Sequence, residues 1–139
     1  MSPDDFKRLK KKDWLFDWHL EAKKDNRKVF KLVIEGNEDV IQGLVSLSIE
    51  RDHIYMYLIE SVKFNKGKNK VYMGVPGNLV AFACHYSIEN GFEGFLAFDA
   101  KTVLVKHYEE SLYAKHIGRC RMIIDNLAAE RLISQYFKR

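Results

Sequence analysis

The fold of this chain is decided by residues 58–91, which read LIESVKFNKGKNKVYMGVPGNLVAFACHYSIENG. The segment opens as a β-strand, passes through a lysine-rich loop and continues as a helix predicted over 76–90. Pro76 suits the first turn of such a helix, and Gly91 stands where a glycine commonly ends one. A short apolar strand over 94–99 follows. A strand–helix–strand unit of this length predicts a crossover between two parallel strands.

The segments on either side extend this unit into a larger sheet. Alternating and β-branched patterns predict an antiparallel meander before it, with strands over 14–20, 29–35, 40–50 and 53–62. After it we expect a helix over 102–111, two strands over 114–117 and 121–124, and a terminal helix over 127–137. Trp14 and Trp18 also lie one helical turn apart, which leaves a helix open as the alternative there. The predicted fold class is α/β (α+β), with a mixed, mostly antiparallel sheet, a central crossover and flanking helices.

Length and composition indicate a single domain spanning residues 1–139. Residues 1–12 are expected to form a basic arm, either flexible or helical. No apolar run approaches the ~20 residues that cross a bilayer, and no signal-peptide pattern is present, so a cytoplasmic location is expected. The net charge is +4. Basic clusters favour phosphates, and three occur, over residues 7–12, 23–28 and 63–70. The first two are interpreted as solvated surface.

The start of the predicted helix has the features of an anion site. Gly74 and Gly77 flank its first turn and permit close approach of a ligand to the backbone. Val75 and Pro76 supply no capping oxygen, so the free N–H groups need another acceptor, which an anion would provide. A cap by the Asn78 side chain is the alternative. Positive charge comes from the loop before the helix, which holds Lys63, Lys66, Lys68 and Lys70.

The same segment resembles motif A of the GNAT superfamily of acetyl-CoA-dependent N-acetyltransferases. That motif consists of a strand, a loop with the pattern Arg/Gln-x-x-Gly-x-Gly/Ala, and a helix that ends in glycine. Gly74 matches the first glycine, Pro76 stands at the second glycine position, and Val71 stands where the family has Arg or Gln. Residues 107–112, HYEESL, resemble the family's Phe-Tyr-Glu-x-x-Gly-Phe segment. The resemblance covers roughly residues 28–126.

The resemblance implies an N-acetyltransferase in which an amine attacks acetyl-CoA directly. Tyr108 matches the tyrosine that protonates the leaving thiolate. Glu60, at the end of its strand, is the candidate general base facing the cleft, and His53 and Tyr57, on the opposite face of that strand, are the alternatives. A backbone N–H near Glu60 and Ser61 is expected to polarise the thioester. The candidate cofactor-binding residues are Ile59, Ser61, Lys68, Lys70, Met73, Gly74, Val75, Gly77, Asn78, Leu79 and Lys101.

Other interpretations stay open from the sequence. One is a non-catalytic acyl-CoA-binding module of the same fold, because fold does not fix function. Another is a basic nucleic-acid-binding protein, and a third joins the two classes in an acetyltransferase whose acceptor is attached to RNA. The histidines and cysteines show no metal-ligand spacing, so no metal is expected. The aromatic row of Trp14, Phe16 and Trp18 is either a core face or a dimer face. Its strand is expected to replace the pair of helices that the family has near the acceptor site.

Overall fold

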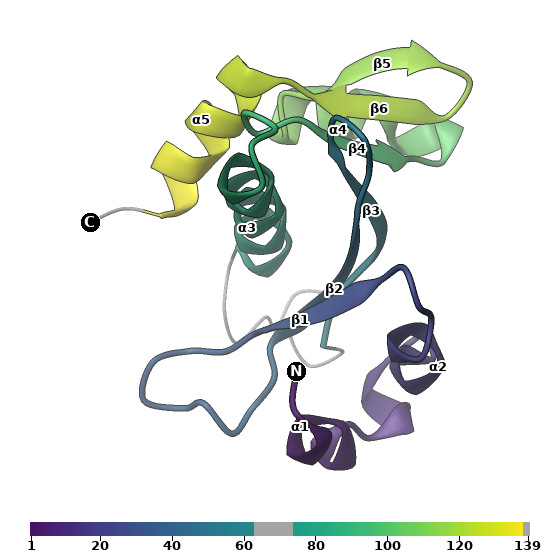
Figure 1. Ribbon diagram of the computed structural model, residues 1–139, viewed down its shortest axis with the longest axis vertical. Helices are drawn as coiled ribbons and strands as arrows, with labels where there is room; N and C mark the ends of the chain where they lie inside the picture. Colours follow the sequence, from purple (N-terminus) through teal and green to yellow (C-terminus); the bar gives the residue numbers. More distant parts are fainter. Residues whose placement is uncertain (63–73, 138–139) are drawn as a thin grey trace.

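The computed structural model describes residues 1–62 and 74–137 and shows one six-stranded sheet with helices on both faces (Figure 1). The strand order is β1-β2-β3-β4-β6-β5. Only β3 and β4 pair in parallel within this sheet, and its other neighbouring strands pair antiparallel. The strands are β1 (Lys28–Leu32), β2 (Gly43–Ile49), β3 (Ile54–Ser61), β4 (Leu96–Asp99), β5 (Lys115–Gly118) and β6 (Arg121–Ile124).

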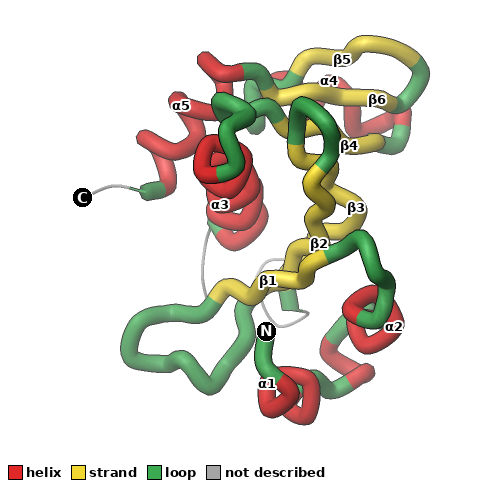
Figure 2. Tube along the Cα trace, in the orientation of Figure 1, coloured by secondary structure: helices red, strands yellow, loops and turns green. Residues whose placement is uncertain are grey.

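The helices pack on the two faces of the sheet, and most of them are seen to one side or the other of the strands in Figure 2. One face carries the crossover helix α3 (Val75–Glu89), together with α4 (Val105–Ser111), which follows the short turn η3 (Thr102–Leu104), and α5 (Asn126–Tyr136). The other face is covered near β1 and β2 by α1 (Pro3–Arg8), η1 (Lys11–Asp13) and α2 (Trp18–Ala22). None of the described helices has the length and apolar character to cross a membrane.

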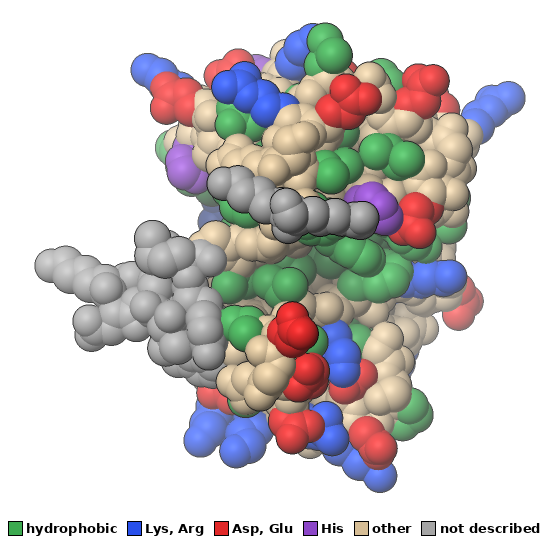
Figure 3. Space-filling model, turned by 90° about the vertical axis from the view of Figure 1, so that its left-hand side faces the viewer, with side chains coloured by type: hydrophobic (Ala, Val, Ile, Leu, Met, Phe, Trp, Pro, Cys, Tyr) green, Lys and Arg blue, Asp and Glu red, His purple; other side chains and the backbone are tan. Residues whose placement is uncertain are grey.

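Each face of the sheet has its own hydrophobic core. The larger core lies between α3, α5 and the strands, and includes the fully buried side chains of Leu96, Met122 and Leu132. The smaller core lies under the N-terminal helices and includes Trp18 and Leu44. Hydrophobic side chains also gather in a hollow on the face shown in Figure 3. The mixed sheet, the crossover helix and the flanking helices confirm the predicted fold class.

The predicted strand over 14–20 is wrong, because this segment is a turn followed by the helix α2. The carboxylate of Asp17 caps α2 by accepting from the backbone N–H of Leu20 at 3.1 Å. Trp14 and Trp18 are buried and meet edge to face, with ring centroids 6.4 Å apart, while Phe16 is 39% exposed. The alternative of a helix through both tryptophans is not realised either, because Trp14 is extended after η1 and only Trp18 lies in α2. The N-terminal helices expected to be replaced are present.

A β-bulge in β3 changes which side chains face which core. Leu47 pairs with Met56 and Ser46 pairs with Leu58, so Tyr57 has no partner opposite it in β2. An extra residue reverses the alternation of a strand beyond it. Met56 accordingly packs in the core on the α3 side, whereas Leu58 packs against the N-terminal core.

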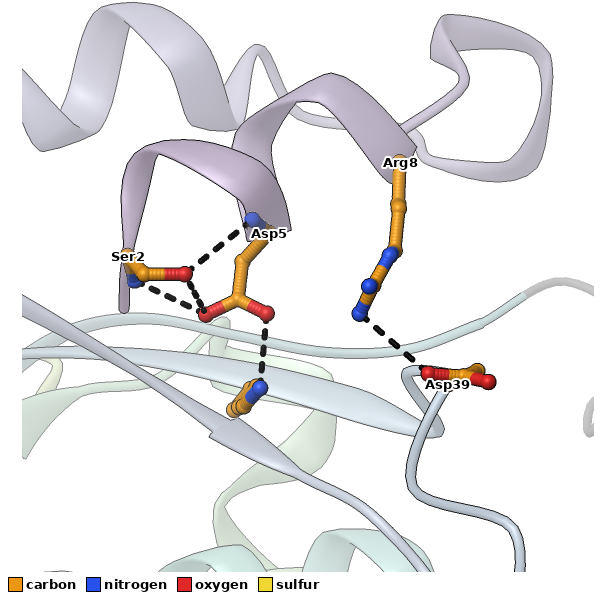
Figure 4. A network of polar contacts seen from close by, with 5 residues as sticks. Ser2, Asp5, Arg8 and Asp39 are labelled. Carbon is orange, nitrogen blue, oxygen red and sulfur yellow. Dashed lines mark hydrogen bonds and ion pairs between the residues drawn. The ribbon is translucent and has the colours of Figure 1, made fainter.

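A buried aspartate fastens α1 to the sheet. Asp5 is 4% exposed, and its carboxylate accepts from Lys31 Nζ at 2.6 Å and from the backbone N–H of Ser2 at 2.8 Å. Figure 4 shows Asp5 facing Ser2, and the neighbouring Arg8 paired with Asp39. The hydrogen bond from Lys31 is the largest of the interactions that lower the pKa of Asp5 to about 2.

The anchoring by Asp5 is expected to weaken in acid. Because its pKa in the folded state lies below the unfolded value of about 4, its contribution is complete above that pH and is lost as the pH falls towards 2. Asp5→Asn should therefore lower the free energy of unfolding at pH 7 by about 1–2 kcal/mol. The gap to the wild type should close near pH 2 in urea titrations. Asp4→Asn, at the exposed neighbouring position, is the control. A gap that did not depend on pH would contradict this role.

Candidate functional site

The central parallel pair of strands separates after two residues, and a cavity lies where it opens. Only Ile54 and Tyr55 of β3 pair with β4. Beyond them the cavity, of about 300 Å³, is lined by residues 56–59 of β3 and by the first turns of α3. The end of β4, the inner side of α4 and Tyr136 of α5 complete its described walls. This is the mouth between neighbouring strands at which crossover folds bind ligands.

The start of α3 contributes a helix terminus without a side-chain cap. Gly74 is the N-cap, with φ +77°, a left-handed conformation that favours glycine. Asn78 does not cap the helix, because its Nδ2 donates to the carbonyl of Gly74 at 2.8 Å and leaves the first-turn N–H groups without its oxygen. The geometry therefore contradicts the capping alternative. It leaves N–H donors at a cavity wall, where the helix dipole favours an anion.

Tyr108 of α4 lies in the wall of the same cavity. Its ring packs edge to face on Phe98 of β4, with centroids 5.5 Å apart, and His107 lies beside it in the lining. Because Phe98 is itself buried, this edge-to-face contact fixes the orientation of the phenol ring. The cavity therefore brings a positioned phenol into the space that the start of α3 also borders.

Glu60 lies away from the cavity, which contradicts the expectation that it faces the cleft. Its carboxylate is 4% exposed and lies under the N-terminal segment. It accepts from the backbone N–H groups of Leu15 at 2.5 Å and Phe16 at 3.2 Å, and from the indole N–H of Trp18 at 2.9 Å. The physical reason is the bulge at Tyr57, which turns every later side chain of β3 to the opposite face. The cavity lining likewise includes residues 56–59 of β3 but not Ser61.

An ion pair between Asp99 and Arg121 lies at the edge of the cavity where β4 ends. Asp99 lines the cavity and accepts from Arg121 Nε at 2.8 Å and from the hydroxyl of Tyr55 at 2.9 Å. The hydrogen bond from Arg121 keeps the pKa of Asp99 below its usual range. Burial, reinforced by the bond to Asp99, raises the pKa of Tyr55 to about 12. Asp99 is thus an anion with two partners, which makes it a poor proton acceptor.

The structure separates the candidate cofactor-binding residues into three groups. Ile59, Gly74 and Gly77 line the cavity. Five others are described but do not belong to its lining: the buried Ser61, Val75 and Leu79, the partly buried Asn78 and the exposed Lys101. Lys68, Lys70 and Met73 lie outside the described residues.

Tyr136 and Tyr57 also line the cavity. The sequence named Tyr57 only as an alternative base and did not identify Tyr136. Tyr136 lies almost sixty residues from Gly77 in the chain, and no local pattern reports such a contact. Tyr57 gains its place from the bulge, and its outer face carries Arg27, whose guanidinium carbon lies 3.6 Å from the ring centroid. In the described part of the chain, no group of three or more histidine, cysteine or acidic residues could hold a metal ion.

Comparison with known proteins shows likeness in structure. No family model matches the sequence, and no curated protein matches it. The chain is similar to one in the crystal structure of the KacTA–DNA complex, with a TM-score of 0.63 and 14% identity over 90% of both chains. It is also similar to a mutant of the AtaT toxin bound to the C-terminus of the antitoxin AtaR, with a TM-score of 0.51 and 17% identity over 68% of this chain and 65% of that chain. At these identities the likeness bears on the fold, and together with the separated strand pair it shows that the chain has a GNAT-like fold.

Proposed function

We propose that this protein is an N-acetyltransferase that moves an acetyl group from acetyl-CoA to an amine. The observation that carries the proposal is the cavity at the opening between β3 and β4, which joins the uncapped start of α3 to the phenol of Tyr108. The start of α3 supplies N–H donors for a pyrophosphate, and the phenol of Tyr108 supplies a proton for the leaving thiolate. The GNAT-like fold of the solved neighbours supports the same class of reaction.

In this proposal, the reaction needs little covalent help from the protein. The cavity holds the thioester and the amine together, which lowers the entropic part of the barrier. The amine nitrogen forms a bond to the acetyl carbon while the carbon–sulfur bond breaks, and a backbone N–H of residues 56–59 polarises the carbonyl. Tyr108 gives its proton to the departing thiolate. His107 takes the proton that the amine loses, because Glu60 lies outside the cavity and Asp99 is engaged by Arg121.

Calorimetry followed by a turnover assay tests this function. Acetyl-CoA and free CoA should both bind, with dissociation constants on the order of 1–100 µM, and thiol release should follow when a panel of amines is added. Binding without release from any amine would favour the non-catalytic acyl-CoA-binding module. Absence of binding would contradict both.

The solved neighbours also suggest a macromolecular partner. One was determined in a complex with DNA and the other with an antitoxin segment. On this comparison we propose a protein or nucleic-acid partner for this chain as well. A salt-dependent affinity for DNA or RNA would support the nucleic-acid class. No affinity at low salt would exclude it.

A further inference from the structure

The ring of Tyr136 lies against the first turn of α3, at a glycine that leaves room for it. A Cβ added to Gly77 would lie 2.1 Å from Cζ of Tyr136, 2.3 Å from its hydroxyl oxygen and 2.6 Å from Cε1. Real Cβ atoms do not approach other atoms so closely. The position that a side chain at residue 77 would occupy is thus filled by an aromatic ring, and the same ring lines the cavity.

The terminal helix is held firmly enough to place this ring. Leu132 of α5 is fully buried in the larger core, and Gln135 accepts from the hydroxyl of Tyr113 at 2.9 Å. At its other end, α5 packs so closely on Gly94 that an added Cβ there would lie 2.5 Å from the Cβ of Ala129. The final turn therefore presents Tyr136 to α3 from a helix packed along its length.

The hydroxyl of Tyr136 lies at the first turn of α3. The ring is half-buried, and its hydroxyl makes no hydrogen bond to another described residue. It lies beside Gly77 and near Gly74, whose hypothetical Cβ would be 3.5 Å from Cε1 of the ring. A phenol donates one hydrogen bond, and such a bond to an anion is stronger than one to a neutral acceptor. In the sequence, Val71 stands three residues before Gly74, where the GNAT motif has Arg or Gln, and valine has no side-chain donor.

We propose that Tyr136 is a cofactor-binding residue whose ring closes the cavity at α3 and whose hydroxyl donates to a phosphate of acyl-CoA. The proposal rests on the proposed function and adds to it a residue from the C-terminal helix. In this proposal Gly77 leaves room for the ring of Tyr136. Gly77 and Tyr136 together recognise the part of the ligand that carries the pyrophosphate.

The test compares Tyr136→Phe with the wild type in two measurements. Calorimetry gives the affinity for acetyl-CoA, and the turnover assay gives the inhibition by S-acetyl-pantetheine. Phenylalanine keeps the ring and loses the donor, so acetyl-CoA should bind about tenfold more weakly. Inhibition by S-acetyl-pantetheine, which has no pyrophosphate, should be unchanged. Gly77→Ala, which displaces the ring, should weaken acetyl-CoA binding at least as much. Ser134→Ala, at an exposed position on the same helical turn, is the matched control and should bind as the wild type does.

The outcomes separate the two proposals. If the wild type binds acetyl-CoA and Tyr136→Phe binds it equally well, the role of Tyr136 is overturned while the function stands. If Tyr136→Phe weakened the binding of acetyl-CoA and of S-acetyl-pantetheine equally, the role would also be overturned. Lost packing would weaken both ligands, whereas a lost hydrogen bond to the pyrophosphate weakens only acetyl-CoA. If the wild type itself does not bind acetyl-CoA, the proposed function fails, and the role of Tyr136 fails with it.

Discussion

Tyr108→Phe is expected to lower turnover about 100-fold while the affinity for acetyl-CoA stays near that of the wild type, since general acids of this kind contribute factors of that order. The reason is the placement of the phenol in the cavity wall, with its ring fixed on Phe98. Phenylalanine keeps this packing and removes the proton donor. The measurement is the initial rate of thiol release at saturating acetyl-CoA, combined with calorimetry on the same preparation.

Two companion variants sharpen this result. Tyr113→Phe removes a hydroxyl that bonds to Gln135 outside the cavity lining, and its turnover should match the wild type. His107→Gln removes the proposed proton acceptor and should lower turnover at pH 7 about 100-fold. Full turnover by Tyr108→Phe would show that the thiolate leaves without this acid. Unchanged turnover of His107→Gln would assign the amine's proton to another acceptor.

Glu60→Ala is expected to destabilise the protein by about 3 kcal/mol, a large part of the 5–15 kcal/mol typical of a domain. The carboxylate accepts hydrogen bonds from three donors in the N-terminal segment, and alanine would leave the indole N–H of Trp18 without that acceptor in a buried place. Urea unfolding measures the loss. Limited proteolysis should show earlier cleavage within residues 9–22, since the connection of this segment to β3 is weakened.

The matched variants are Glu60→Gln and Glu130→Ala. Glutamine keeps one acceptor oxygen and should destabilise by about half as much, and its folded fraction should keep most of its turnover because the side chain does not reach the cavity. Glu130 is exposed on α5, and its substitution should change neither property. Normal stability with lost turnover in Glu60→Gln would return this residue to the role of a base.

Local sequence signals predicted most of the elements because their causes lie within a few residues. The helix expected over 76–90 is α3, bounded by the residues that the turn chemistry requires at its ends. The strands after residue 28 were found from their β-branched and apolar runs. At Trp14 and Trp18 two periods competed, and neither runs through the whole segment, because the chain turns between them before α2 begins. Both rings are buried in the smaller core, where the indole N–H of Trp18 donates to Glu60.

The sequence by itself determined the crossover unit, the glycine-capped start of α3 and the tyrosine of α4, because each follows from residues next to one another in the chain. Only the tertiary structure decided which side chains meet in the cavity. One unpaired residue, Tyr57, turned Glu60 from the cleft to the N-terminal core, since a shift of one residue exchanges the two faces of a strand. Packing of α5 on α3 brought Tyr136 to Gly77, a contact between distant parts of the chain that no local period encodes.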